Sequence, residues 1–361
     1  MSVKISLSLA AAAASALLSG CLDGPSESAG SGKVRKGMPI DSILGAHAAV
    51  LVGKTLYVGN RDADAPGIAA LDVETDRIVA FYPETLPPND LAALGDSQLV
   101  IAETDFADGA ISLLDLRTKK LEASYSQIDA DNAVSSEGGK AFLFQKTLGT
   151  VSGFRNGRLE KGNVFLDVQT GEKSNPYHLA LDGDHAFITR YGSSSLLVID
   201  AGKLDGGARD SINLSDFAAS PAGGPNAVPN MDGIVRHGRN LFVAVQRMTG
   251  FQALDTSKIV IIDADTRKVT GSLALRFRNP IALAAWGNHL YVTGVDGYGT
   301  FEGGVEHIDM ENQVNEGVVV AEADLPGPSD VYDFIPVSDT KGYVIYASDF
   351  TISRIKAVTL P

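Results

Sequence analysis

A short apolar strand pattern recurs seven times along this chain, at intervals of roughly 40 to 55 residues. Gly, Asp or Asn stands just before most copies, which is the turn chemistry of a β-hairpin. The copies begin at Leu56, Leu99, Ala141, Ala186, Leu241, Leu290 and Tyr343.

Each unit contains further strands around this one. In most units the next strand ends in Asp, as at Asp72, Asp115 and Asp263, and a tight turn and another strand follow. One more apolar strand opens each unit, and no helical periodicity is present. Residues 41–361 give about 46 residues per unit, the length of a propeller blade. These features predict an all-β fold, a seven-bladed β-propeller of four-stranded antiparallel blades, because a β-sandwich would not repeat the same hairpin and terminal Asp.

The last unit ends early, since residues 352–360 form its third strand and no fourth follows before Pro361. An open strand edge exposes unpaired backbone N–H and C=O groups. We therefore predict that residues 33–40 supply the missing strand and close the ring, in a single domain spanning 33–361. Unit three lacks the closing Asp, and unit four carries an insertion at 205–230.

The repeat resembles the YVTN/YncE-like seven-bladed β-propeller family. Leu56-Tyr57-Val58-Gly59-Asn60 and Leu290-Tyr291-Val292-Thr293-Gly294 are its best copies, and the strand ending in Asp and the turn after it follow the same pattern. The resemblance covers about nine-tenths of the chain, residues 41–361. It implies the fold strongly and the function poorly, because propellers serve as scaffolds, binders and enzymes.

Residues 1–20 are typical of a secretory signal peptide, with Lys4 as the positive region and a short apolar stretch up to Leu18. Leu18-Ser19-Gly20-Cys21 resembles a bacterial lipobox, which implies that Cys21 carries acyl chains such as palmitate and anchors the protein in a lipid bilayer. The alternative is an ordinary signal peptide followed by a chance Cys. Residues 21–32 are rich in Gly and Ser and predict a flexible tether. Leu22 after the Cys favours the outer membrane, with the domain facing the periplasm or the surface of a bacterial cell.

Composition excludes several classes of protein. The 44% hydrophobic content argues against disorder, and its dispersion argues against a multi-span membrane protein. The formal net charge of −14 argues against a nucleic-acid partner. One Cys leaves no disulfide framework and no Cys-based zinc site.

Polar and aromatic side chains follow the second strand of nearly every unit, and a ring would bring them to one face. Arg guanidinium groups bind carboxylate or phosphate groups of a ligand, aromatic rings stack on its flat parts, and carboxylates accept its hydrogen bonds. The alternative interpretation is that these polar and aromatic side chains are ordinary solvated loop residues. The ligand-binding candidates are Asn60, Arg61, Asp62, Asp105, Phe106, Arg190, Tyr191, Gln246, Arg247, Asp296, Tyr298, Asp349 and Phe350. The long loops 248–257 and 297–304 are expected to form a pocket wall.

A second polar set lies between units and is expected to approach the central channel, where it caps turns. It includes Asn89-Asp90, Asp131-Asn132, Tyr177-His178, Asn230-Met231-Asp232, Asn279-Pro280 and Ser329-Asp330.

Catalytic, metal and cofactor signatures are absent from the sequence. It has no Gly-x-Ser-x-Gly elbow, and its six His residues show no metal-ligand spacing. The favoured hypothesis is a non-catalytic envelope lipoprotein whose propeller binds a small molecule or an envelope protein, for example a nutrient passed to an outer-membrane transporter. The alternatives are a lactonase-like or polysaccharide-processing enzyme and an envelope assembly scaffold.

Overall fold

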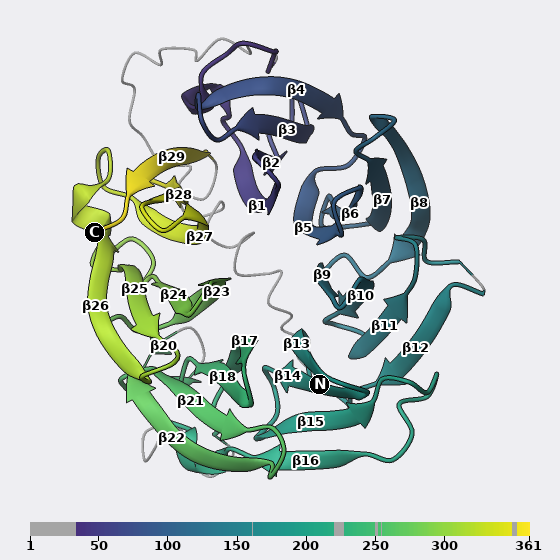
Figure 1. Cartoon of the computed structure of the whole chain (residues 1–361), viewed down its shortest axis with the longest axis vertical. Coiled ribbons are helices and arrows are strands. Elements are labelled where there is room, and N and C mark those ends of the chain that lie inside the picture. Colours follow the sequence, from purple (N-terminus) through teal and green to yellow (C-terminus); the bar gives the residue numbers. More distant parts are fainter. Residues whose placement is uncertain (1–33, 161, 220–226, 250–251, 254, 349–351) are drawn as a thin grey trace, which may run out of the picture.

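Seven small antiparallel sheets surround a central channel in the computed structural model of the chain (Figure 1). The structure describes residues 34–160, 162–219, 227–249, 252–253, 255–348 and 352–361. The signal peptide, Cys21 and the tether lie outside these residues. The prediction of a seven-bladed, all-β propeller is confirmed.

Each blade runs from an inner strand at the channel to an outer strand at the rim, in chain order. Blades 1 to 3 are β1 (Ala46–Val52), β2 (Thr55–Asn60), β3 (Gly67–Asp72), β4 (Arg77–Pro83); β5 (Pro88–Leu94), β6 (Gln98–Thr104), β7 (Gly109–Asp115), β8 (Lys120–Ile128); β9 (Asn132–Glu137), β10 (Lys140–Gln145), β11 (Thr150–Phe154), β12 (Val164–Gln169). Blades 4 and 5 are β13 (Pro176–Asp182), β14 (His185–Arg190), β15 (Ser195–Asp200), β16 (Asp210–Asn213); β17 (Met231–His237), β18 (Asn240–Val245), β21 (Lys258–Asp263), β22 (Lys268–Ala274). Blades 6 and 7 are β23 (Pro280–Trp286), β24 (His289–Gly294), β25 (Gly304–Asp309), β26 (Val314–Ala321); β27 (Asp330–Ser338), β28 (Lys341–Ala347), β29 (Ser353–Thr359).

Elements outside the blades are short. A hairpin of β19 (Met248–Thr249) and β20 (Gln252–Ala253) stands in the loop of blade 5. Three single-turn 3₁₀ helices occur at η1 (Ile40–Ser42), η2 (Ser215–Phe217) and η3 (Glu322–Asp324). The insertion of unit four contains the fourth strand of its blade, β16. No helix among the described residues is long and apolar enough to cross a bilayer.

The Asp that ends the third strand of most blades fixes the turn after it. The Asp72 carboxylate accepts hydrogen bonds from the backbone N–H of Glu74 and Thr75, and Asp263 accepts one from Thr266. These backbone bonds hold the pKa of each carboxyl below its usual range. The repeated Asp is thus a turn residue and not a ligand group. We call the end of the ring that carries these turns the lower face, and the opposite end the upper face.

Both faces of each blade are covered by its neighbours, and the core is a circle of seven interblade clusters. The middle strands are therefore almost continuously buried, as in β6 and β18. This explains why the strands read as unbroken apolar runs and do not alternate.

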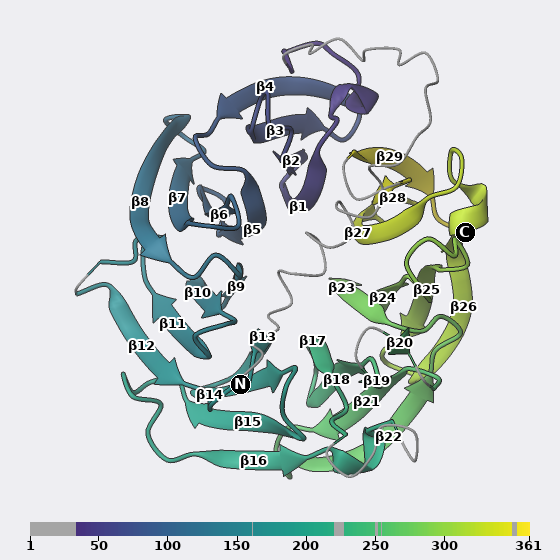
Figure 2. The ribbon, with the colours of Figure 1, turned by 180° about the vertical axis from the view of Figure 1, so that it is seen from behind.

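The structure corrects the prediction that residues 33–40 supply the fourth strand of blade 7. The sheet of blade 7 has three strands, β27, β28 and β29, among the described residues. The segment before blade 1 instead makes a bridge between Pro39 and Arg77 of β4. Because η1 interrupts that segment, its backbone does not follow β29 as a ladder strand. In both views β29 is the outermost labelled strand of blade 7 (Figures 1 and 2).

Side chains, and not a shared ladder, close the ring between blades 7 and 1. Val34 and Ile43 are buried in one cluster with Tyr343 and Ile355 of blade 7. The Lys341 ammonium donates to the Val73 carbonyl and to Asp76 of blade 1, at 2.7 and 2.8 Å. The N-terminal segment thus contributes to closure by packing.

Deletion of residues 22–32 should leave the melting midpoint nearly unchanged, whereas deletion of 22–40 should lower it. The longer deletion removes Val34, Met38 and Ile40 from the closing cluster, and loss of one buried aliphatic side chain costs about 1.5–3 kcal/mol. Thermal unfolding followed by circular dichroism measures both. Equal midpoints for the two truncations would contradict closure by packing.

Candidate functional site

The inner strands turn consecutive side chains toward the channel near its upper end. Six of the seven inner strands carry a register shift close to their first residues; β9 of blade 3 pairs regularly. A β-bulge places an extra residue against the partner strand and re-aims the side chains beside it. As a result, the pairs Asn89–Asp90, Tyr177–His178 and Tyr332–Asp333 line one cavity.

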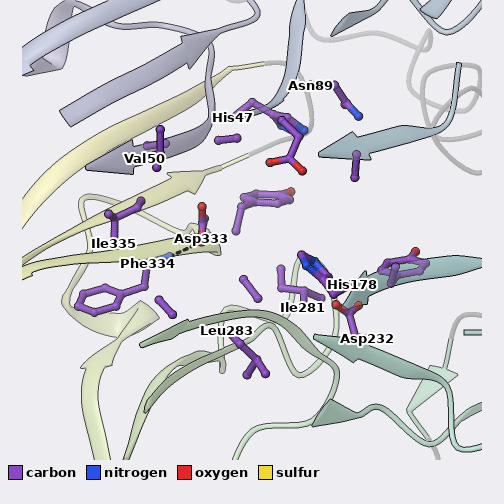
Figure 3. Close-up of a pocket in the computed structure, with 18 of the residues that line it drawn as sticks. His47, Val50, Asn89, His178, Asp232, Ile281, Leu283, Asp333, Phe334 and Ile335 are labelled. Atoms are coloured by element: carbon purple, nitrogen blue, oxygen red, sulfur yellow. Dashed lines mark hydrogen bonds between the residues drawn. The ribbon is translucent and has the colours of Figure 1, made fainter. Parts of the chain in front are cut away.

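This channel cavity has a volume of about 740 Å³ and two chemically different sides (Figure 3). Blades 1 to 5 supply its polar side, with His47, Arg61, Asn89, Asp90, Asp131, Lys146, Tyr177, His178 and Asp232. Blades 6, 7 and 1 supply its apolar side, which includes Val50, Leu51, Ile281, Leu283, Phe334 and Ile335. Asp333 stands among the apolar group (Figure 3).

Lys146 is one of the two basic residues of the polar side, with Arg61, and its side chain is 16% exposed. The ammonium lies 3.6 Å from Asp131 and 4.3 Å from the centre of the Tyr177 ring. Burial lowers the pKa of His178, and the ammonium charge lowers it further. For Asp232 burial raises the pKa, and the same charge offsets part of that rise. One ammonium therefore acts on several buried groups around the channel.

Three carboxyls of the cavity hold protons unusually well. Burial raises the pKa of Asp90 to about 6 and those of Asp232 and Asp333 to about 7. Asp90 accepts a hydrogen bond from the Val134 backbone, and Asp232 accepts one of 2.9 Å from the Gln246 amide. Near neutral pH the cavity thus carries less negative charge than its composition suggests.

The two His side chains of the cavity are neutral. Burial, together with the charges of Arg61 and Lys146, lowers the pKa of His47 to about 3. Burial and the charge of Lys146 lower that of His178 to about 4. Both rings are therefore neutral donors and acceptors at physiological pH.

Arg61 connects the rim to the cavity. Its guanidinium lies 3.2 Å from both His47 Nε2 and the Asn89 side-chain oxygen, and 4.9 Å from the centre of the Phe106 ring. The Asn89 amide donates in turn to the Asn132 carbonyl at 2.6 Å. These contacts join blades 1, 2 and 3 at the upper mouth. The contact of Lys146 in blade 3 with the Tyr177 ring in blade 4 adds a fourth blade.

On the other side of the mouth, a row of contacts runs between aromatic rings and the Gln246 amide. Tyr177 stacks on Tyr191 with centroids 5.3 Å apart, and the Tyr191 hydroxyl donates to Gln246 at 3.0 Å. Tyr298 stacks on Tyr332 with centroids 6.1 Å apart. The structure thus brings five of the predicted residues, Arg61, Phe106, Tyr191, Gln246 and Tyr298, around this mouth.

Arg190 and Arg247 lie elsewhere and direct their donors to the protein itself. Arg190 donates to the carbonyls of Thr170 and Ser195. Arg247 is 9% exposed, donates to the carbonyls of Phe217 and Thr256, and pairs with Asp255 at 2.6 Å. These contacts hold adjacent segments together, so the expectation that the three Arg side chains present free forks together is not what the geometry shows.

The other predicted residues mostly shape loops. Asn60 is fully buried and donates to the Ala65 carbonyl, while Asp62 accepts from the Asp64 backbone. Asp105 accepts from two backbone N–H groups of its own turn, those of residues 107 and 108. Asp349 and Phe350 lie outside the described residues.

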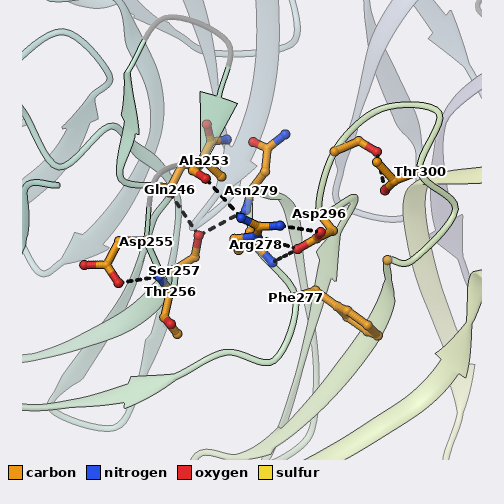
Figure 4. Close-up of polar contacts among 12 residues, drawn as sticks. Gln246, Ala253, Asp255, Thr256, Ser257, Phe277, Arg278, Asn279, Asp296 and Thr300 are labelled. Carbon is orange, nitrogen blue, oxygen red and sulfur yellow. Dashed lines mark hydrogen bonds and ion pairs between the residues drawn. The ribbon is translucent and has the colours of Figure 1, made fainter. Parts of the chain in front are cut away.

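At the junction of blades 5 and 6, Arg278 bridges the long loop 248–257 to Asp296, the residue before the second long loop 297–304 (Figure 4). Arg278 holds both Asp296 oxygens, at 2.8 and 2.9 Å, and donates to the Ala253 carbonyl at 3.3 Å. Ser257 bonds to the Gln246 carbonyl and to the Asn279 N–H. Asp296 is therefore a partner of Arg278, and these loops brace the rim.

The sequence placed the interblade residues near the channel but suggested a capping role for them, and the ligand-binding candidates chosen from it did not include Lys146, His47 or Asp333. Part of the signal was present in the sequence, because His47, Asp90 and His178 are polar residues at the second or third position of otherwise largely apolar inner strands. Their convergence depends on the bulges. No group of three or more His, Cys, Asp or Glu among the described residues is arranged to hold a metal ion.

No protein-family model matches the chain, and no curated protein is similar to it in sequence. Solved structures are similar in fold. Virginiamycin B lyase from Staphylococcus aureus has a TM-score of 0.58 at 13% identity, over 87% of this chain and 95% of that one. A streptogramin B lyase has 0.59 at 14%, over 90% and 96%. A dihydro-heme d1 dehydrogenase has 0.52 at 15%, over 88% and 66%. Similarity at this level shows the propeller fold alone.

Stability should fall as the pH rises from about 4 to about 7, in part through Asp333. Because its pKa is raised, the folded protein keeps a proton that the unfolded chain has lost across this window. The variant Asp333→Asn should lose part of this dependence, a few degrees in midpoint between pH 5 and pH 8.

Thermal melts at several pH values measure this, with Asp184→Asn, an exposed carboxyl on the lower face, as the control. Identical pH profiles for Asp333→Asn and the unmodified protein would contradict the assignment.

Proposed function

We propose that the propeller binds a small amphipathic molecule in the channel cavity, with an apolar body against blades 6, 7 and 1 and an anionic or hydrogen-bonding edge against Lys146. The observation that carries the proposal is the segregation of polar and apolar side chains to opposite sides of one 740 Å³ cavity. Ligand cavities commonly combine an apolar lining with a few fixed polar groups.

The charges of the cavity support an anionic group on the ligand. Lys146 and Arg61 place two basic side chains at the mouth, whereas burial raises the pKa of Asp90, Asp232 and Asp333 and favours their protonated forms. Tyr177, whose ring contacts the Lys146 ammonium and stacks on Tyr191, adds an aromatic group to the same side of the cavity. A flat ring system with a carboxylate or phosphate group fits these features.

The envelope location completes the proposal. The lipobox-like sequence ending at Cys21 supports attachment to a bilayer, and a nutrient passed to an outer-membrane transporter is the favoured role. Binding without catalysis is the simplest role for this set of side chains, because the neutral His residues and the Lys146–Asp131 pair need no reaction to explain them.

Lys146→Ala should weaken binding strongly, by on the order of 2–5 kcal/mol if its contact with the ligand is desolvated. Flavin mononucleotide and protoporphyrin IX are suitable first probes in a thermal-shift screen, followed by calorimetry on any hit. Affinity should also rise as the pH falls from 8 to 6, since protonation of Asp232 and Asp333 removes negative charge.

Lys173→Ala is the matched control, because Lys173 is an exposed Lys in the upper-face loop between blades 3 and 4. It should bind as the unmodified protein does. Full affinity in both Lys146→Ala and Arg61→Ala would place the ligand outside this cavity.

A second candidate is an enzyme that transfers a proton. Asp232 is 4% exposed, lines the cavity beside His178 and has a pKa of about 7, which suits a general base. Two proteins of similar fold are lyases. Conversion of a bound probe during incubation, abolished by Asp232→Asn with binding retained, would assign the chain to this class.

Cys21→Ser should release the protein from membranes into the soluble fraction. Lipidation contributes about 0.8 kcal/mol per buried CH₂, and stable attachment needs more than one chain. Detergent partitioning of cell extracts measures this, and retention of the Ser variant with membranes would contradict the anchor while leaving the cavity proposal intact.

A further inference from the structure

Among the residues that the structure describes, no strand pairs with the outer edge of blade 7. Residues of β29 pair with β28 in an unbroken antiparallel register from Ser353 to Thr359. The Leu360 N–H donates to the Thr340 carbonyl just beyond this ladder. Because backbone groups alternate in direction along an antiparallel strand, residues 354, 356 and 358 bond to β28, and residues 353, 355, 357 and 359 direct N–H and C=O away from it.

A cleft of about 590 Å³ runs along this edge. Residues 354–357 of β29 form one side of it, and residues 39–41 and 75–77, from η1 and blade 1, form the other. Pro326 and Tyr346 complete the lining. The cleft therefore lies beside the strand edge where each of the other six blades has a fourth strand.

The cleft carries a local positive charge on a chain whose formal net charge is −14. Arg77, Arg354 and Lys356 line it, and none of the three forms an ion pair among the described residues. Of the two carboxyls in the lining, Asp76 is already bound by Lys341. An acidic segment would thus meet Arg354 and Lys356, which have no carboxylate partner among the described residues, and Arg77, which donates to the Gly37 carbonyl at 2.9 Å.

The chain's own N-terminal sequence is a poor occupant. Residues 34–43 are committed to the closing cluster and to the bridge with β4. The preceding sequence, residues 22–32, is rich in Gly, Ser and Pro, which strands disfavour. The occupant that fits is therefore a strand from another protein.

We propose that blade 7 binds an extended acidic peptide segment of a partner protein, which adds to the free edge of β29 as its fourth strand. Main-chain hydrogen bonds from residues 353, 355, 357 and 359 would supply affinity, as in other cases of strand addition. Arg77, Arg354 and Lys356 would select acidic side chains. This surface is separate from the channel cavity and does not depend on the function proposed for it.

The test uses the purified soluble chain, residues 22–361, and a nine-residue peptide that alternates threonine and glutamate. Residue-resolved amide hydrogen exchange should show that the N–H groups of Ile355 and Ala357 slow at least tenfold on peptide addition, whereas those of Arg354 and Lys356, already bonded to β28, change little. This alternation is specific to strand addition.

The double variant Arg354→Glu/Lys356→Glu should weaken peptide binding at least tenfold in fluorescence anisotropy. Arg117→Glu/Lys119→Glu is the matched control, with the same charge change and spacing in an exposed turn of blade 2, and should bind normally. Ala357→Pro, which removes one outward N–H, gives an independent loss of binding.

Three results would overturn the proposal. One is equal binding of a peptide with lysine in place of glutamate. Another is slowed exchange at a strand other than β29. The third is slow exchange of Ile355 and Ala357 in the free chain that becomes fast when residues 22–32 are deleted, because the chain's own segment would then fill the cleft.

Discussion

The structure depends on the face-to-face packing of its blades. No blade has a solvated face of its own, since each interblade cluster draws side chains from two neighbouring sheets. A single sheet of this composition would expose apolar surface on both sides, so the ring is stable only when every neighbour is present. The boundary between blades 7 and 1 is where this requirement is hardest to meet, because chain connectivity does not enforce it.

The sequence was sufficient to predict the fold because packing on both faces of a blade requires middle strands that are apolar throughout, and this pattern is visible in the sequence. Buried middle strands such as Leu241–Val245 are apolar throughout, and an Asp marks the turn after the third strand in most blades. The closing strand could not be predicted in the same way. Residues 33–40 have a suitable length and position, but the 3₁₀ turn at Ile40–Ser42 and the bridge to Arg77 follow from tertiary contacts.

The site was predictable only in part. Five of the loop residues predicted after the second strand lie around one mouth, and three of them, Arg61, Tyr191 and Gln246, contact the groups that line the channel. Sequence could not show that Arg190 and Arg247 would bond to backbone carbonyls, because those acceptors come from segments distant in the chain. Nor could it show that bulges would orient neighbouring side chains, such as those of Tyr177 and His178, toward the same cavity.

The two faces of the ring differ in what sequence change they tolerate. Most lower turns are short and in most blades one is held by an Asp, although the turns 155–163 and 201–209 have nine residues each. The upper connections between the second and third strands range from four residues, as at 191–194 in blade 4, to the twelve residues 246–257 in blade 5. The described residues of these second-to-third-strand connections belong to none of the seven interblade clusters, so insertions there leave the clusters untouched. A lineage of such proteins can therefore diversify its binding specificity on one side of the disc while the other side preserves the architecture.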